Sequence, residues 1–183
     1  MTIPGPPGDP RRQELSDLAD ERARLSRELA AMRQALQLAD AARESLSDLQ
    51  QKLGRGSRWS AFDTFFGGGK IADAIVHRRL DEAADVAAEA DYRLGLLRTE
   101  LAGLHGTMPT FPLLQISTRT KLVDMWADNI FTDMAVHDRI KQARQNADHP
   151  LQVVQEAQEQ LTSRVDQVQA RLTSIEAAMG SGA

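Results

Sequence analysis

Cysteine is absent from this 183-residue chain, and its absence excludes several classes of protein at once. The chain has no disulfide scaffold, no cysteine-ligated zinc or iron–sulfur centre and no thiol nucleophile. Long apolar runs are also missing, because charged residues interrupt each one before the roughly 20 residues that a membrane-spanning helix needs. We therefore expect no transmembrane segment.

Aromatic residues are scarce, with two Trp, one Tyr and five Phe, whereas alanine is abundant and most of the 22 basic residues are arginine. Strong helix formers thus dominate, and the residue types that strands prefer are few. The formal net charge of -4 argues against a general nucleic-acid binder. The composition predicts an all-α protein and is typical of a bacterial, cytoplasmic protein.

Proline and glycine divide the chain, because both residues are costly inside helices. The start of the chain is rich in proline and lacks the features of a secretory signal, so we predict a disordered leader over 1–9. Helices are predicted over about 10–53, 70–104, 118–147 and 150–179, with a frayed tail at 180–183. An aromatic turn at 57–69 and an extended linker at 105–117 separate them, and Asp148-His149-Pro150 is predicted to be a tight joint.

Apolar residues recur at alternating steps of three and four along these helices, which is the heptad pattern of coiled coils. The seam of the first helix is Leu15, Leu18, Arg22, Leu25, Leu29, Met32, Leu36, Ala39, Arg43, Leu46, Gln50 and Leu53. The seam of the second is Asp73, Val76, Leu80, Ala83, Ala87, Ala90, Leu94, Leu97, Leu101 and Leu104. The seam of the last is Leu151, Val154, Gln158, Leu161, Val165, Val168, Leu172, Ile175 and Met179.

These seams predict one elongated domain over 10–179, built as an antiparallel coiled-coil assembly of four long helices. The first two helices are expected to form a hairpin, and the last is expected to pack on the third. Regular heptads on the first and last helices also favour a homodimer.

An Asp/His pattern occurs twice in the chain. Asp73 and His77 lie four residues apart, and Asp133 and His137 repeat the spacing 60 residues later. Each pair falls on one face of its predicted helix. Carboxylate and imidazole groups from two helices are ligands for a divalent metal such as zinc, iron or manganese. Two other interpretations stay open: a hydrogen-bonded polar layer that fixes the helix register, and partial exposure at a helix edge.

Half of the aromatic residues lie in one short stretch. Trp59, Phe62, Phe65 and Phe66 fall on one side of a short helix, within a locally basic part of the chain. This surface would plug the end of the bundle or bind a protein partner. Contact with an anionic membrane or with nucleic acid is the least favoured alternative.

Known catalytic motifs are not found. The run Gly67-Gly68-Gly69-Lys70 lacks the spacing and the hydroxyl residue of a phosphate-binding loop, and neither G-x-S-x-G nor H-E-x-x-H occurs. We predict no catalytic residue and no organic cofactor, and we favour a non-enzymatic protein.

The segments RWSAFDTFFGGGKIADAIVHRRLDEA and DMWADNIFTDMAVHDRIKQA resemble blocks that recur in bacterial helical proteins with coiled-coil flanks. The resemblance covers about a quarter of the chain. It implies a bacterial source, and it assigns no role to any residue.

Two functions are consistent with these patterns. The first is a non-enzymatic, coiled-coil structural or protein-interaction protein of the bacterial cytoplasm that binds a protein partner or itself. The alternative is a helical-bundle metal-binding protein that uses the two Asp/His pairs.

Overall fold

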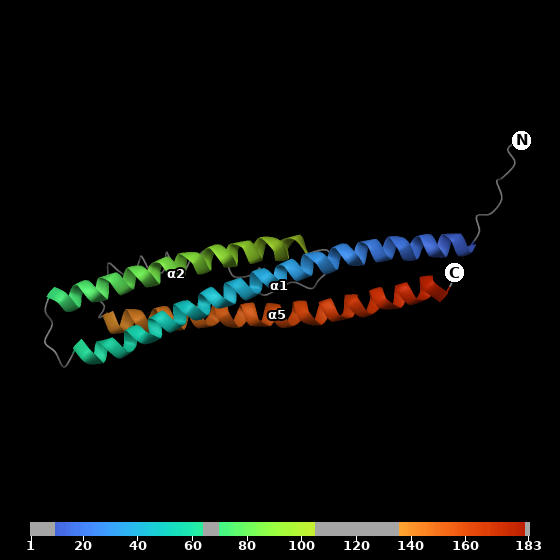
Figure 1. Cartoon of the computed structure of the whole chain (residues 1–183). Helices are drawn as coiled ribbons and strands as arrows, with labels where there is room; N and C mark the ends of the chain where they lie inside the picture. Colours follow the sequence, from blue (N-terminus) through green and yellow to red (C-terminus); the bar gives the residue numbers. More distant parts are fainter. Residues whose placement is uncertain (1–9, 64–69, 105–135, 182–183) are drawn as a thin grey trace, which may run out of the picture.

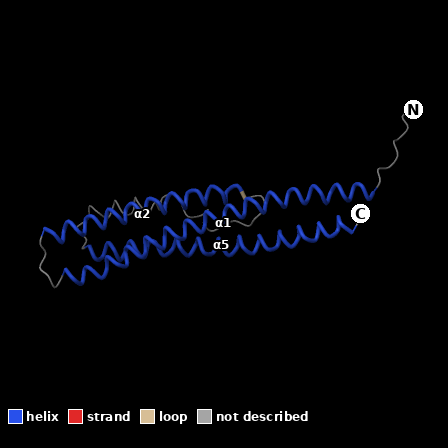
Figure 2. The backbone as a smooth tube through the Cα atoms, in the orientation of Figure 1, coloured by secondary structure: helices blue, strands red, loops and turns tan. Residues whose placement is uncertain are grey.

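A computed structural model describes residues 10–63, 70–104 and 136–181 of the chain. Three helices make up these ranges, namely α1 (Pro10–Asp63), α2 (Lys70–Gly103) and α5 (Val136–Ser181) (Figure 1). Figure 2 shows no strand among the described residues. The predicted all-α fold is therefore confirmed. None of the three described helices has an apolar stretch long enough to span a lipid bilayer.

Helix α1 is the central element, because it packs against both α2 and α5 (Figure 1). Hydrogen bonds join Arg22 to Glu176 and Gln50 to Asp148, so residue numbers rise along α1 as they fall along α5. Bonds from Gln34 to Glu100 and from Arg93 to the carbonyl of Ala41 give α2 the same orientation. Both neighbours thus run antiparallel to α1, and they run parallel to each other.

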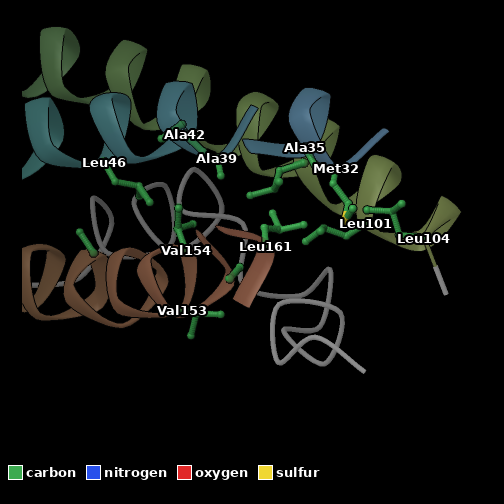
Figure 3. Close-up of a cluster of buried hydrophobic side chains, with 14 of the residues drawn as sticks. Met32, Ala35, Ala39, Ala42, Leu46, Leu101, Leu104, Val153, Val154 and Leu161 are labelled. Atoms are coloured by element: carbon green, nitrogen blue, oxygen red, sulfur yellow. The ribbon is translucent and has the colours of Figure 1, made fainter. Parts of the chain in front are cut away.

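The seams predicted on α2 and on the last part of α5 agree with the observed burial. On α2 the buried side chains are Ala83, Ala87, Ala90, Leu97, Leu101 and Leu104. On α5 the predicted positions divide into two rows. One row is fully buried and consists of Val154, Leu161, Val168 and Ile175, whereas the other row, Leu151, Val165, Leu172 and Met179, is partly buried. These residues pack against α1, as Figure 3 shows for Val154 and Leu161.

The seam predicted on α1 is only partly right, because α1 has two neighbours and buries a wider face. After Met32 the buried positions are Ala35, Ala39, Ala42, Leu46, Leu49 and Leu53. The predicted positions Leu36 and Gln50 are only half-buried, and Arg43 is exposed. A helix that packs against one partner needs a single apolar stripe along its surface. A helix that contacts two partners needs a larger part of its circumference to be apolar.

The tight joint predicted at Asp148-His149-Pro150 is wrong, since α5 runs without a break from Val136 to Ser181 with Pro150 inside it. A proline inside a helix costs about 3 kcal/mol through the missing hydrogen bond and the clash with the preceding turn. Buried side chains on both sides of it, Ala147 and Val154, hold the helix on α1 and offset that cost. Because the helix continues, residues 150–179 cannot fold back on 136–147.

The predicted end of the first helix at Leu53 is also wrong, since α1 continues through Gly54 and Gly56 to Asp63. Each glycine costs about 1 kcal/mol in a helix, which a long helix tolerates when it is packed on both sides. Leu53 itself is buried. Part of the predicted aromatic turn, 57–63, is therefore helical. The leader at 1–9, the linker at 105–117 and residues 118–135 of the third predicted helix lie outside the described residues.

Helix α2 covers only part of α1. Its end lies near the middle of α1, beyond which α1 and α5 continue as a pair (Figure 1). We call 31–54 of α1, with 82–104 of α2 and 147–163 of α5, the three-helix section. We call 10–30 of α1 and 164–181 of α5 the two-helix section.

Candidate functional site

The most elaborate polar arrangement in the described chain is a series of contacts between α1 and α5. At its centre lies Glu28, a carboxylate whose side chain is only 3% exposed. Arg164 donates two hydrogen bonds to its Oε1 atom, from Nε at 3.0 Å and from Nη2 at 2.8 Å. Because an unpaired buried carboxylate is costly, this pair fixes the rotation of α1 relative to α5.

Seven residues further along α5, Arg171 binds Glu21 through two nitrogen atoms of its guanidinium group. The distances are 2.9 Å from Nε to Oε1 and 2.8 Å from Nη2 to Oε2. The hydrogen bond from Arg171 lowers the pKa of Glu21, and the bond to Glu21 raises the pKa of Arg171. Each group therefore stays charged over a wider pH range than it would alone.

The remaining contacts between these helices are more exposed. Arg22 donates to Glu176 at 3.2 Å, and both side chains are more than half exposed. Other members of the series are Arg33 to Gln169 at 3.2 Å, Gln158 to Asp40 at 2.7 Å and Gln50 to Asp148 at 2.6 Å. Exposed pairs of this kind add little stability, but together they follow α1 from Gln50 to Arg22 and α5 from Asp148 to Glu176.

Arg93 links α2 to α1 in the three-helix section. Its Nη1 atom donates to the backbone carbonyl of Ala41 at 3.0 Å and lies 3.8 Å from Glu44. Its Nε atom donates to Glu89 at 2.6 Å, one turn earlier on α2. A single guanidinium group thus bridges the two helices. In contrast, the buried Nε atom of Arg98 has no hydrogen-bond partner among the described residues.

A shallow hollow lies beside this bridge and is lined by Asp40, Ala41, Arg43, Glu44 and Ser47. All five residues belong to α1. An active site is usually formed by groups that converge from several elements. This hollow is instead the open side of one helix, and its charged side chains already bind neighbouring helices: Asp40 binds Gln158, and Glu44 faces Arg93.

All of the predicted site residues lie outside the part of the chain whose side chains are described. Asp73, His77 and His137 belong to the helical stretches of α2 and α5, but their side chains are outside the described residues, and Asp133 is outside entirely. The same holds for Trp59 and Phe62 in α1, and Phe65 and Phe66 lie beyond its end. Among the described residues, no group of three or more His, Asp or Glu side chains is placed to hold a metal ion. The metal site and the aromatic partner surface stay predictions.

The buried pair of Glu28 and Arg164 was not predicted from the sequence, although a signal for it exists. Glu21 and Glu28 stand seven residues apart on α1, and Arg164 and Arg171 stand seven residues apart on α5. Equal heptad spacing of opposite charges on two antiparallel helices is the pattern expected for an interhelical ion-pair row. The sequence shows the spacing, but only the relative position of the two helices shows that the rows meet.

Comparison of the chain with protein-family models, with curated proteins and with solved structures found no match.

Proposed function

We propose that this chain is a non-enzymatic coiled-coil protein of the bacterial cytoplasm with a structural or protein-interaction role. The observation that supports it is the pairing of α1 with α5, whose side chains are linked from Gln50 and Asp148 to Arg22 and Glu176. A helix of 54 residues such as α1 is about 80 Å long, far more than a compact domain of this size requires. Helices of this length serve to span a distance or to present a long surface.

The described surface also contains exposed apolar groups that suit a protein contact. Tyr92 and Leu96, one turn apart on α2, are 62% and 39% exposed. Gly95, Thr99 and Gly103 nearby on α2 are exposed and uncharged, and the charged neighbours Glu89 and Glu100 are bonded to Arg93 and Gln34. We propose that copies of the chain associate through this face, since its charged neighbours already have partners and would not be left unpaired in the contact.

Sedimentation equilibrium over a range of concentrations tests the proposed association. The wild type should form dimers, and the double variant Tyr92→Ser with Leu96→Ser should stay monomeric with unchanged helical content. The matched control is Ala170→Ser, at an exposed position on α5. A monomeric wild type at all concentrations would contradict self-association. Dimers that persist in the double variant would assign the interface to another face.

The alternative function is metal binding by Asp73, His77, Asp133 and His137. It is supported by the arrangement of α2 and α5, which run parallel and begin at the same end of the assembly (Figure 1). Metal analysis of the purified protein, with thermal melts before and after addition of a chelator, tests this function. Bound zinc, iron or manganese that is lost in His77→Ala and His137→Ala would support it. A metal-free protein with an unchanged melt would exclude it.

A further inference from the structure

One side of α1 changes from buried to exposed where α2 ends. In the three-helix section this side faces α2, because Gln34 and Ala41 beside it bind Glu100 and Arg93 of α2. The side chains on it are small or apolar there and are buried or partly buried, namely Ala31, Ala35, Leu38, Ala42 and Ser45. Eighteen residues, or five helical turns, earlier in the chain the same side carries exposed polar residues, namely Gln13, Asp17, Asp20, Arg24 and Arg27.

The charged members of this second set, which we call the charged row, lie beyond the end of α2. Since Gln34 binds Glu100 and α2 ends at Gly103, the last residue of α2 lies opposite about residue 31 of α1. Helix α5 lies on another side of α1, where it binds Arg22. No described helix therefore covers the charged row, which consists of Asp17, Asp20, Arg24 and Arg27.

The charged row has few contacts within the chain. Asp17 accepts a hydrogen bond from Gln13, one turn earlier. Arg24 acts on Glu21 through its charge, without a hydrogen bond. Within the described part of the chain no member of the row forms an ion pair, although acids and bases lie on the same side of one helix. The charges of the row are therefore available to a second chain.

The order of the charges in the row suits an antiparallel pair of helices. Asp17 and Arg27 lie equally far from residue 22, and so do Asp20 and Arg24. When two copies of α1 lie antiparallel about a two-fold axis at this level, every directly opposed pair in the row joins opposite charges. The helix dipole does not explain the order, because its effect is confined to the first turn, which ends before Asp17.

The overhang of α1 has room for a second helix in this position. Beyond the end of α2 only α5 accompanies α1 among the described helices, and the overhang continues to Pro10 (Figure 1). Helices that pack as coiled coils cross at about 20°, so that the first turn of the partner's α1 passes beside the end of α2. The contact therefore continues the side of α1 that already packs against a helix in the three-helix section.

We infer that the charged row is a contact between two copies of this chain, which lie antiparallel and pair Asp17 with the partner's Arg27 and Asp20 with the partner's Arg24. The contact goes beyond the proposed function, because it lies on α1 and does not involve the exposed apolar face of α2. Exposed ion pairs add little stability, so the contact is weak and depends on salt. Charges act over about 30 Å at about 0.01 M salt but over only about 8 Å at about 0.15 M. The contact therefore forms at low ionic strength and dissociates as salt is added.

Charge-reversed variants test the contact in a parent chain that already carries the double change on α2, so that the α2 face does not contribute. The acidic variant, Arg24→Asp with Arg27→Asp, has four acids in the row. The basic variant, Asp17→Arg with Asp20→Arg, has four bases. All four positions are exposed, and circular dichroism checks that each chain keeps the helix content of the parent. Sedimentation equilibrium at about 0.01 M and about 0.15 M salt measures association.

The parent should form dimers at the lower salt concentration and lose them at the higher one. Each variant alone should stay monomeric, because like charges then face each other across the two-fold axis. An equimolar mixture of the two variants should form a heterodimer at low salt, since every opposed pair again joins an acid and a base. The matched control, Glu159→Arg with Asp166→Arg on exposed positions of α5, changes the net charge as the basic variant does and should associate like the parent.

Three results would overturn the inference. The first is a parent chain that stays monomeric at low salt, and the second is a mixture of the two variants that stays monomeric. The third is a control that loses association together with the basic variant, which would make net charge the cause. The association through α2 is measured separately, with the wild type at about 0.15 M salt, so that the failure of one contact is distinguished from the failure of the other.

Discussion

The same heptad rows of α1 and α5 run through both sections of the assembly, but they hold apolar residues in the three-helix section and charged residues in the two-helix section. On α1 one row reads Leu49, Ala42 and Ala35 in the three-helix section and then Glu28 and Glu21 in the two-helix section. On α5 the corresponding row reads Pro150 and Ala157, and then Arg164 and Arg171. The apolar members are buried, and the charged members form the ion pairs of Glu28 with Arg164 and of Glu21 with Arg171.

The change in chemistry coincides with the end of α2. Where a third helix is present, the row faces the inside of the assembly, and alanine lets the helices approach closely. Where α2 has ended, the row lies at the margin of a helix pair, so that Arg164, Arg171 and Glu21 keep access to water, and the buried Glu28 is paired with Arg164. The α1 residues Arg24 and Arg27, which follow in this section, are exposed and charged.

The largest effect is expected when the charged row is moved into the three-helix section. Ala35→Glu combined with Ala157→Arg copies the pair of Glu28 and Arg164 one heptad along, at two positions that are fully buried. Two charges then lose their hydration, which costs several kcal/mol for each ion. We expect loss of the cooperative thermal transition by circular dichroism. A variant as stable as the wild type would show that the two sections do not differ in access to water.

Replacement of one leucine in each section by alanine compares how much side-chain packing stabilises the three-helix section and the two-helix section. Leu161→Ala removes a fully buried side chain of the three-helix section and should lower the free energy of unfolding by about 2–5 kcal/mol. Leu172→Ala removes a partly buried side chain of the two-helix section and should cost about 1 kcal/mol. Urea denaturation of both variants provides the comparison. Equal losses would mean that the third helix adds nothing to the burial of this seam.

A double-mutant cycle on Glu28 and Arg164 measures the coupling free energy of the ion pair that lies at the boundary between the two sections. Glu28→Ala leaves two donors of Arg164 without their acceptor and should cost about 1–3 kcal/mol. The double variant with Arg164→Ala should cost less than the sum of the single changes. The same cycle on the exposed pair of Arg22 and Glu176 is the control, with a coupling of about 0–1 kcal/mol. Coupling of equal size in both cycles would contradict a special role for Glu28.

The smallest effect is a pH dependence confined to the two-helix section. Because the folded chain lowers the pKa of Glu21 below its ordinary value of 4.5, the pair with Arg171 stabilises the fold above that value. The stabilisation is lost as the pH falls through the lowered pKa. Glu21→Gln should therefore reduce the loss of stability between about pH 5 and pH 3, measured by urea denaturation at each pH, whereas Glu14→Gln should not. If the stability of both variants depended on pH in the same way, Glu21 would not be the cause of the loss of stability at low pH.

Much of this architecture was predictable from local patterns. Heptad spacing identified the buried positions of α2 from Ala83 to Leu101 and both rows of α5 from Leu151 to Met179, because among the described helices each of these stretches packs against α1 alone. On α1 after Met32 the method was only partly right: Ala39, Leu46 and Leu53 are buried as predicted, but contact with two partners widens the buried face beyond the seam. It also missed Glu28, since the matching seven-residue spacings on α1 and α5 identify an ion pair only when the relative position of the two helices is known.

The sequence by itself determined that this chain is helical, which faces of α2 and α5 are apolar, and where the heptad rows change from alanine to glutamate and arginine. Those properties depend on residue propensity and spacing along one helix. The tertiary structure decided that α5 continues through Pro150, that α1 extends beyond Gly54 and Gly56, and that Arg164 meets Glu28. Each of these depends on contacts between residues far apart in the chain, whose energy exceeds the local cost of a proline, a glycine or a buried charge.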